Sequence, residues 1–113
     1  MAIRAIKSYT DISQSRKLAE FLPLESADMY RVFENNSETR VYYGKTPTAH
    51  FVCKPCWSLS ALLEIIRISC CGELQMNRKG YFFVAKGFIT LYYSNSVDAC
   101  YEMITRLREL NLL

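Results

Sequence analysis

The chain has 113 residues, of which 50% are apolar and 13% aromatic, and its formal net charge is +3. A chain of this length commonly forms one domain, and this composition can supply a hydrophobic core. We therefore expect a single domain over residues 1–113 rather than a disordered chain. The small charge excess does not indicate a nucleic-acid-binding protein by itself.

The apolar residues and the cysteines point to the interior of a cell. No run approaches the roughly 20 apolar residues that span a bilayer. Charged residues interrupt the apolar residues at the N-terminus too often for a signal-peptide core. We therefore expect a cytoplasmic protein with no membrane partner. Five cysteines are an odd set that fits reduced, partly buried thiols better than a secreted disulfide framework.

The first predicted helix runs from about Asp11 to Leu22, with Thr10 as its N-cap and Pro23 at its end. Its apolar residues fall on one side, as in an amphipathic surface helix. Val and aromatic residues then alternate with polar turn-forming stretches, which favours short strands. These strands are expected over residues 30–33, 40–43 and 49–53.

A second helix is expected to begin at Ser58, its N-cap, and to reach about Ile68. It is apolar on most sides, so we interpret it as the central core helix. The strands that follow are separated by turns containing Gly80 and Gly87, which favours an antiparallel meander. We place these strands over residues 74–76, 81–85 and 88–93. The middle strand is apolar on both faces and is therefore expected at the centre of its sheet or under another subunit.

The last predicted helix begins after Asn95 or Ser96, with Asp98 in its first turn and arginines in its last. The apolar tail, residues 110–113, is expected to dock onto the core or a partner. Segregated helices and a meander predict an α+β fold. We expect three helices packed on a mixed-to-antiparallel sheet that contains a three-stranded meander in the C-terminal half, followed by the C-terminal helix.

Cys53 and Cys56 form a CxxC motif between a predicted strand and a predicted helix. A helix N-terminus stabilises a thiolate, and this spacing can close a disulfide, as in thioredoxin-like redox proteins. Those proteins also use a later cis-proline, but no proline follows the motif here, and Trp57 lies after it rather than before it. A thiol–disulfide protein is therefore kept as an alternative.

The same two cysteines could bind zinc together with Cys70 and Cys71, or with His50. Adjacent cysteines chelate poorly as a pair, and a helix of 10 to 12 residues would separate the two groups by about 15–18 Å. His50 is the single histidine, and it lies in no nucleophile motif. We therefore expect no cofactor and no catalytic residues, with zinc binding as part of the same alternative.

Binding functions rest on basic and aromatic residues. Arg78 and Lys79 are expected at a hairpin tip, and Arg16 and Lys17 are expected on the first helix. Two Tyr-Tyr pairs, at residues 42–43 and 92–93, lie in predicted strands, where aromatic rings can stack on unpaired bases. The chain lacks an RNP-like motif, so nucleic-acid binding is a second alternative. Aromatic residues also favour protein interfaces. For a binding surface we select Tyr43, Trp57, Arg78 and Lys79, although a Trp beside a core helix is more often a packing residue.

Three sequence blocks carry a resemblance. They are ISQSRKLAE continuing to LPLESADM over residues 12–29, PCWSLSALL over residues 55–63, and the stretch from NSVDAC over residues 95–110. In this order they resemble a group of small proteins from phages, prophages and mobile elements of gut Bacteroidales. The resemblance covers more than half of the chain and implies a genomic setting but no mechanism.

The leading hypothesis from these observations is a non-enzymatic accessory protein of phage or mobile-element origin. It would bind a host or phage protein through its sheet side or its loops, as a monomer or as a homodimer. The resemblance implies helices that recur among the relatives and strands that vary. A binding surface on the variable strands could then differ from one relative to the next.

Overall fold

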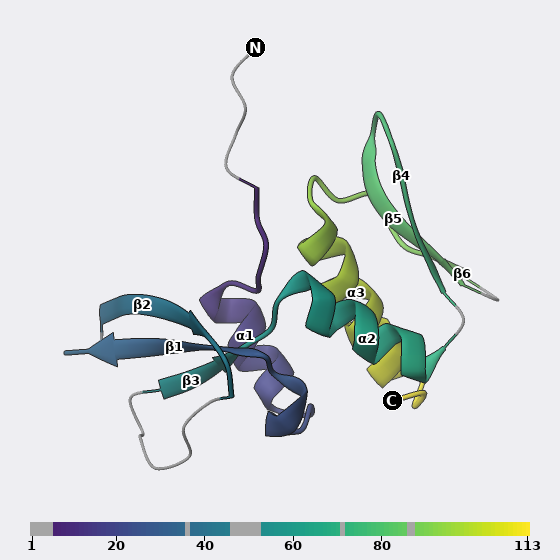
Figure 1. The fold of residues 1–113 in the computed structure, drawn as a ribbon. Helices are drawn as coiled ribbons and strands as arrows, with labels where there is room; N and C mark the ends of the chain where they lie inside the picture. The colour runs from purple at the N-terminus through teal and green to yellow at the C-terminus, as the bar shows by residue number, and fades with distance from the viewer. Residues whose placement is uncertain (1–5, 36, 46–52, 71, 86–87) are drawn as a thin grey trace. The chain divides into compact units, whose positions relative to one another are not determined.

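A computed structural model describes residues 6–35, 37–45, 53–70, 72–85 and 88–113. The α+β class is confirmed, because helices and antiparallel strands occupy separate segments (Figure 1). None of the described helices is long and apolar enough to cross a membrane. The elements are α1 (Ile12–Ala19), a 3-10 helix (Leu24–Ser26), β1 (Met29–Glu34), β2 (Ser37–Tyr43), β3 (Cys53–Cys56), α2 (Leu59–Ser69), β4 (Glu73–Asn77), β5 (Gly80–Ala85), β6 (Phe88–Ile89) and α3 (Ser96–Glu109).

The described strands form two antiparallel sheets of three strands each, in the orders β2-β1-β3 and β4-β5-β6. The predicted meander and its central strand β5 are confirmed, but its third strand is shorter than the predicted 88–93, because β6 covers only Phe88–Ile89 and an isolated bridge joins Tyr93 to Tyr81. The described strands do not join into one sheet. The chain divides into two compact units, Tyr9–Ala61 and Met1–Ser8 with Leu62–Leu113. We call them the inner unit and the terminal unit. The single-domain prediction states that these two units fold together as one domain, and it stays a prediction.

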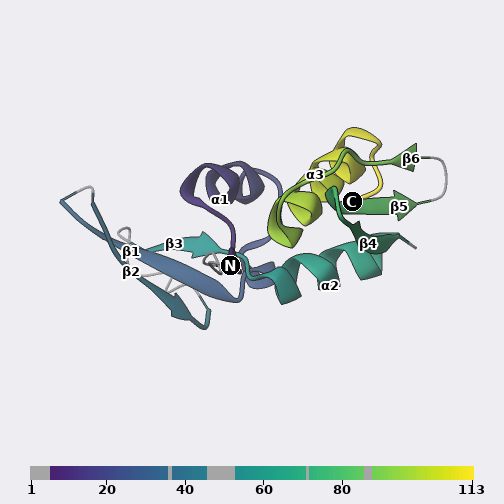
Figure 2. The ribbon, with the colours of Figure 1, turned by 90° about the horizontal axis from the view of Figure 1, so that it is seen from above.

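In the inner unit, α1 lies on one face of sheet β2-β1-β3 (Figure 2). Burial alternates along β1: Met29 and Arg31 are buried, whereas Tyr30 and Val32 are half-buried. Since successive strand residues point to opposite faces, the buried set faces α1 and the half-buried set faces away. Leu18 of α1 is fully buried and contributes to this core.

Helix α1 begins one residue later than predicted. The N-cap is Asp11, whose Oδ1 accepts a hydrogen bond from the backbone N–H of Gln14 at 2.8 Å. The Gln14 side chain accepts the N–H of Asp11 at 3.1 Å, which completes a capping box. Thr10 is buried instead, and its backbone N–H donates to the carbonyl of Trp57 at 2.9 Å. The helix also ends earlier, at Ala19 rather than Leu22.

Helix α2 begins where the sequence predicts. Ser58 caps it, since the Ser58 hydroxyl accepts the N–H of Ala61 at 3.2 Å. One face is buried through Leu62, Ile65 and Ile66, whereas Ile68 is exposed. The helix is therefore buried on a narrower face than its composition suggests.

In the terminal unit, α3 packs on β5 and β4. Its N-cap is Asn95, whose side chain accepts the N–H of Asp98 at 2.8 Å, as predicted. The Asp98 carboxylate also bonds Lys7 Nζ at 2.8 Å, so a segment near the start of the chain is held at the start of α3. The buried residues of α3 are Val97, Ala99, Cys100, Met103, Ile104 and Leu107.

A Schellman motif ends α3. Asn111 has a positive φ of 59°. The N–H of Asn111 donates to the carbonyl of Arg108 at 3.0 Å, and the N–H of Leu112 donates to the carbonyl of Leu107 at 2.9 Å. The leucines at 110, 112 and 113 remain about half exposed, so the described structure does not bury the tail in the core. That the tail docks onto a partner stays a prediction.

Candidate functional site

The CxxC motif does not connect a strand to a helix, because Cys53–Cys56 is itself strand β3, paired with β1. Residues 49–52 of the strand predicted there lie outside the described residues. An extended chain rises about 3.3 Å per residue, so the two Cα atoms are about 10 Å apart. A disulfide needs Cα atoms closer than about 7 Å. This conformation therefore does not allow the two thiols to bond to each other.

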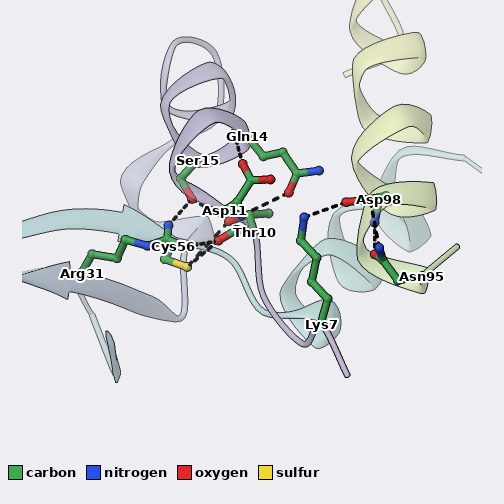
Figure 3. A network of polar contacts seen from close by, with 9 residues as sticks. All are labelled: Lys7, Thr10, Asp11, Gln14, Ser15, Arg31, Cys56, Asn95 and Asp98. Carbon is green, nitrogen blue, oxygen red and sulfur yellow. Dashed lines mark hydrogen bonds and ion pairs between the residues drawn. The ribbon is translucent and has the colours of Figure 1, made fainter. Parts of the chain in front are cut away.

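Cys56 takes part in a buried polar network inside the inner unit (Figure 3). Its Sγ donates to the carbonyl of Thr10 at 3.4 Å and lies 3.7 Å from the Thr10 hydroxyl. The Thr10 hydroxyl bonds Ser15 Oγ at 2.7 Å. Ser15 in turn accepts a hydrogen bond from the Arg31 guanidinium at 2.8 Å. These contacts give Cys56 a structural role between α1 and β3.

Arg31 is the charged member of this network and is only 4% exposed. Its guanidinium also donates to the carbonyl of Thr10 and lies over the Tyr9 ring, 5.6 Å from the centroid. A buried charge is tolerated only when hydrogen bonds replace its hydration. Arg31 therefore ties β1 to the start of α1.

No metal site is formed by the part of the chain that the structure describes. No group of three or more His, Cys, Asp or Glu side chains there is placed to hold an ion. His50 and Cys71, two of the predicted zinc ligands, lie outside the described residues. Cys70 is half-buried, and Cys100, which the zinc hypothesis did not use, is buried.

Trp57 was selected as a surface anchor, and this prediction is wrong. The indole is fully buried, and its Nε1 donates to the Ser26 hydroxyl at 3.0 Å. Trp57 follows β3 directly and precedes the N-cap of α2, and its hydrogen-bond partner Ser26 belongs to the same unit. The residue packs the core, which was the alternative interpretation of this position.

The face of sheet β2-β1-β3 that points away from α1 is aromatic. The rings of Tyr30 and Tyr42 stack with centroids 5.3 Å apart and an angle of 21° between their planes. Tyr30 is paired with Tyr42 on one side and with Pro55 on the other. All three are at least partly exposed, and Tyr42 is 38% exposed. We call these three residues, with Val32 and Cys53 beside them, the tyrosine face.

Tyr43, a predicted binding residue, is 75% exposed at the end of β2. It pairs with the buried Met29 and follows Tyr42 directly, so it lies on the opposite side of the sheet from the tyrosine face. Tyr43 is therefore available at the surface but does not belong to the stacked pair.

Arg78 and Lys79 lie where the sequence predicts, at the exposed tip of the β4–β5 hairpin in the terminal unit. The Lys79 N–H donates to the Asn77 side chain at 2.8 Å, which is an Asx turn. Lys79 Nζ lies over the ring of Tyr92, 5.7 Å from its centroid. Tyr43 belongs to the other unit, so the selected residues do not all come from one surface of one unit.

Sequence reasoning missed Tyr30 and Pro55 as surface residues. The turn between β1 and β2 pairs Glu34 with Ser37, but counting back from that pair would bring Tyr30 opposite Val41. The register shift between Val32 and Phe33 is what brings Tyr30 opposite Tyr42, so no local count along the two strands finds the stacked pair. Pro55 was considered only within the CxxC motif and within the sequence block over residues 55–63.

Comparison with known proteins adds no further assignment: no family model matches the chain, and neither a curated protein nor a solved structure is significantly similar to it.

Proposed function

We propose that this protein is a non-enzymatic protein-interaction module that binds its partner through the tyrosine face. The observation that carries the proposal is the Tyr30–Tyr42 stack beside Pro55 on the sheet face opposite α1. Tyrosine is enriched at protein interfaces because a rigid ring supplies a large contact area with a polar tip. A stacked pair is already held in place, so little side-chain entropy is lost on binding.

The charge of the inner unit favours a protein over a nucleic acid. Residues 9–61 contain six basic and six acidic side chains, so their formal charge is zero. Nucleic-acid affinity depends on cations that neutralise phosphates. An aromatic partner surface is complementary to the tyrosine face, which carries the stacked tyrosines and an exposed cation, Arg40, opposite Val32.

The two edges of this sheet differ in a way that orients the partner. The described part of β3 carries Pro55, which has no N–H to donate, and proline protects an edge strand from pairing. At the other edge, β2 is paired with β1 alone among the described strands. An extended segment of the partner would therefore add beside β2, next to Tyr42, with its side chains on the tyrosine face.

The genomic setting belongs to the same proposal. An accessory protein of a phage or mobile element would use such a face to bind a host or phage protein. A second copy of the chain is the other partner to be tested, because an open β2 edge can pair with itself in a symmetric dimer.

The test compares two neighbouring tyrosines on opposite sides of one strand. Tagged wild type, Y42A and Y43A are used to capture proteins from nuclease-treated lysate of the native cells, with mass-spectrometric readout and circular dichroism to confirm folding. The expected result is one stoichiometric protein retained by wild type and Y43A but lost from Y42A. Retention by folded Y42A, or capture that disappears after nuclease, would overturn the proposal. Light scattering of the purified chain decides whether that protein is a second copy.

A further inference from the structure

The hairpin β4–β5 and the segment after β6 bring cationic and aromatic side chains together in the terminal unit. The rings of Phe82 and Tyr92 meet edge to face with centroids 5.0 Å apart. Lys79, from the hairpin tip, lies over the same Tyr92 ring, which is 47% exposed. Arg78 adjoins Lys79 and is exposed. We call these four residues the basic-aromatic face.

This face points away from the core of its own unit. Phe83 is fully buried and lies on the side of β5 that packs against α3. Phe82 precedes Phe83 in the strand, so it points to the opposite side. The Phe82–Tyr92 pair is therefore on the face of the sheet that α3 leaves open.

The charge of the chain is concentrated in the unit that carries this face. The segments Met1–Ser8 and Leu62–Leu113 contain eight basic and five acidic side chains, which gives a formal charge of +3. The inner unit is neutral, so the whole net charge of the protein comes from the terminal unit. A polyanion would therefore be attracted to the terminal unit more strongly than to the neutral inner unit.

We propose that the basic-aromatic face binds single-stranded nucleic acid. Unpaired bases stack on Tyr92 and Phe82, while Arg78 and Lys79 contact the phosphates on either side. Aromatic side chains bind bases without reading sequence, because every base has a π-face. Duplex nucleic acid keeps its bases stacked internally and cannot use the rings in this way. This site is separate from the tyrosine face, so either proposal can fail without the other.

The experiment measures fluorescence anisotropy of labelled single-stranded oligo-dT and oligo-U, and of a duplex, at several salt concentrations. Four variants are compared with wild type: Y92A, R78A/K79A, Y42A and R16A/K17A. The last is a charge-matched control, since Arg16 and Lys17 are also an adjacent, exposed basic pair but lie on α1 in the neutral unit. Thermal unfolding confirms that each variant is folded.

Single strands should bind more tightly than the duplex, with affinity that falls as salt rises. We expect Y92A to weaken binding roughly tenfold through lost stacking. R78A/K79A should weaken it at low salt and lower the slope of log K against log salt by about 1.4, the value for two phosphates on a single strand. The R16A/K17A and Y42A variants should bind within about twofold of wild type.

Three results would overturn the proposal. Equal losses from the two charge variants would mean that binding follows total charge and not this face. Wild-type affinity in folded Y92A would show that no base stacks on the Tyr92 ring. Absence of any binding at low salt, for both oligonucleotides, would show that the protein does not bind single-stranded nucleic acid. A preference between oligo-dT and oligo-U identifies whether DNA or RNA is the ligand.

Discussion

The carboxylate of Asp28 holds Ser58 at two points, because it accepts the backbone N–H of Ser58 at 2.9 Å and also the Ser58 hydroxyl. The same hydroxyl accepts the N–H of Ala61 in the first turn of α2. Asp28 directly precedes β1, so one carboxylate links the start of a strand to the N-cap of a helix that is 30 residues further along the chain.

Replacing either partner should therefore destabilise the protein. We expect S58A to lower the free energy of unfolding by about 1 kcal/mol through loss of the cap. D28A should cost more, about 1–3 kcal/mol, because it leaves two donors of Ser58 without their acceptor. Urea unfolding measures both, with D11A at the exposed cap of α1 as the control. A D28A variant no less stable than D11A would contradict this account.

Gly80 should tolerate alanine far less well than Gly44. Both have positive φ values, +137° and +124°, which strain any residue with a side chain. A Cβ at Gly80 would also lie 2.3 Å from the carbonyl oxygen of Tyr93, whereas the nearest atom to a Cβ at Gly44 is a Tyr30 ring carbon at 4.0 Å. G44A is expected to cost about 1 kcal/mol and G80A about 2–4 kcal/mol. Equal melting temperatures for the two variants would show that the Tyr93 carbonyl moves away at little cost.

The stability should fall in alkali, and Cys100 should account for part of the fall. Burial raises the pKa of the Cys100 thiol from 9.0 to about 12. Between these values the unfolded thiol has lost its proton and the folded thiol keeps it, so the native state binds more protons. The free energy of unfolding then decreases as pH rises, by up to about 1.4 kcal/mol per pH unit.

The measurement is urea unfolding from pH 7 to pH 10.5 in wild type and C100A. After subtraction of the difference at pH 7, C100A should decline less steeply above pH 9. C53A, which leaves Cys100 in place, is the matched control and should decline like wild type. Burial also raises the pKa of Tyr93, with the Glu102 carboxylate adding to the effect, so a smaller alkaline decline should remain in C100A. Parallel curves for all three proteins would exclude a role for Cys100.

Trp57 should behave as a core residue in every assay. It is the single tryptophan of the chain, so intrinsic fluorescence reports on it alone. We expect blue-shifted emission and weak acrylamide quenching in the native state. W57A should cost about 3–5 kcal/mol, whereas S26A, which removes only the hydrogen bond to Nε1, should cost about 1 kcal/mol. Emission at the wavelength of unfolded protein under native conditions would contradict the buried position.

Local features of the fold could be predicted from the sequence. Ser58 and Asn95 are helix caps that bond the backbone N–H three residues further along. Both partners of each contact therefore lie in one short stretch of sequence, where the cap can be recognised. Thr10 shows where this reasoning stops. Thr10 and Asp11 are adjacent and both suit an N-cap, and the choice depends on Trp57, which engages Thr10 from 47 residues away. No local pattern contains that contact.

The candidate surfaces were predicted less completely for the same reason. Arg78 and Lys79 form a hairpin tip, which is local, and their exposure was predicted correctly. The Tyr30–Tyr42–Pro55 row depends on the register of three strands, and the burial of Trp57 depends on the packing of its unit. The CxxC motif was misplaced because pairing with β1 keeps residues 53–56 in a strand, where a connection between a strand and a helix was expected.

The ion pair between Lys7 and Asp98 has a consequence for synthesis on the ribosome. The two residues are 91 positions apart, and the terminal unit that contains them is assembled from both ends of the chain. The inner unit is one continuous segment, so all of its residues have been translated while most of α3 is still missing. Vectorial synthesis should therefore let the inner unit acquire structure first and leave the terminal unit to fold after translation reaches α3.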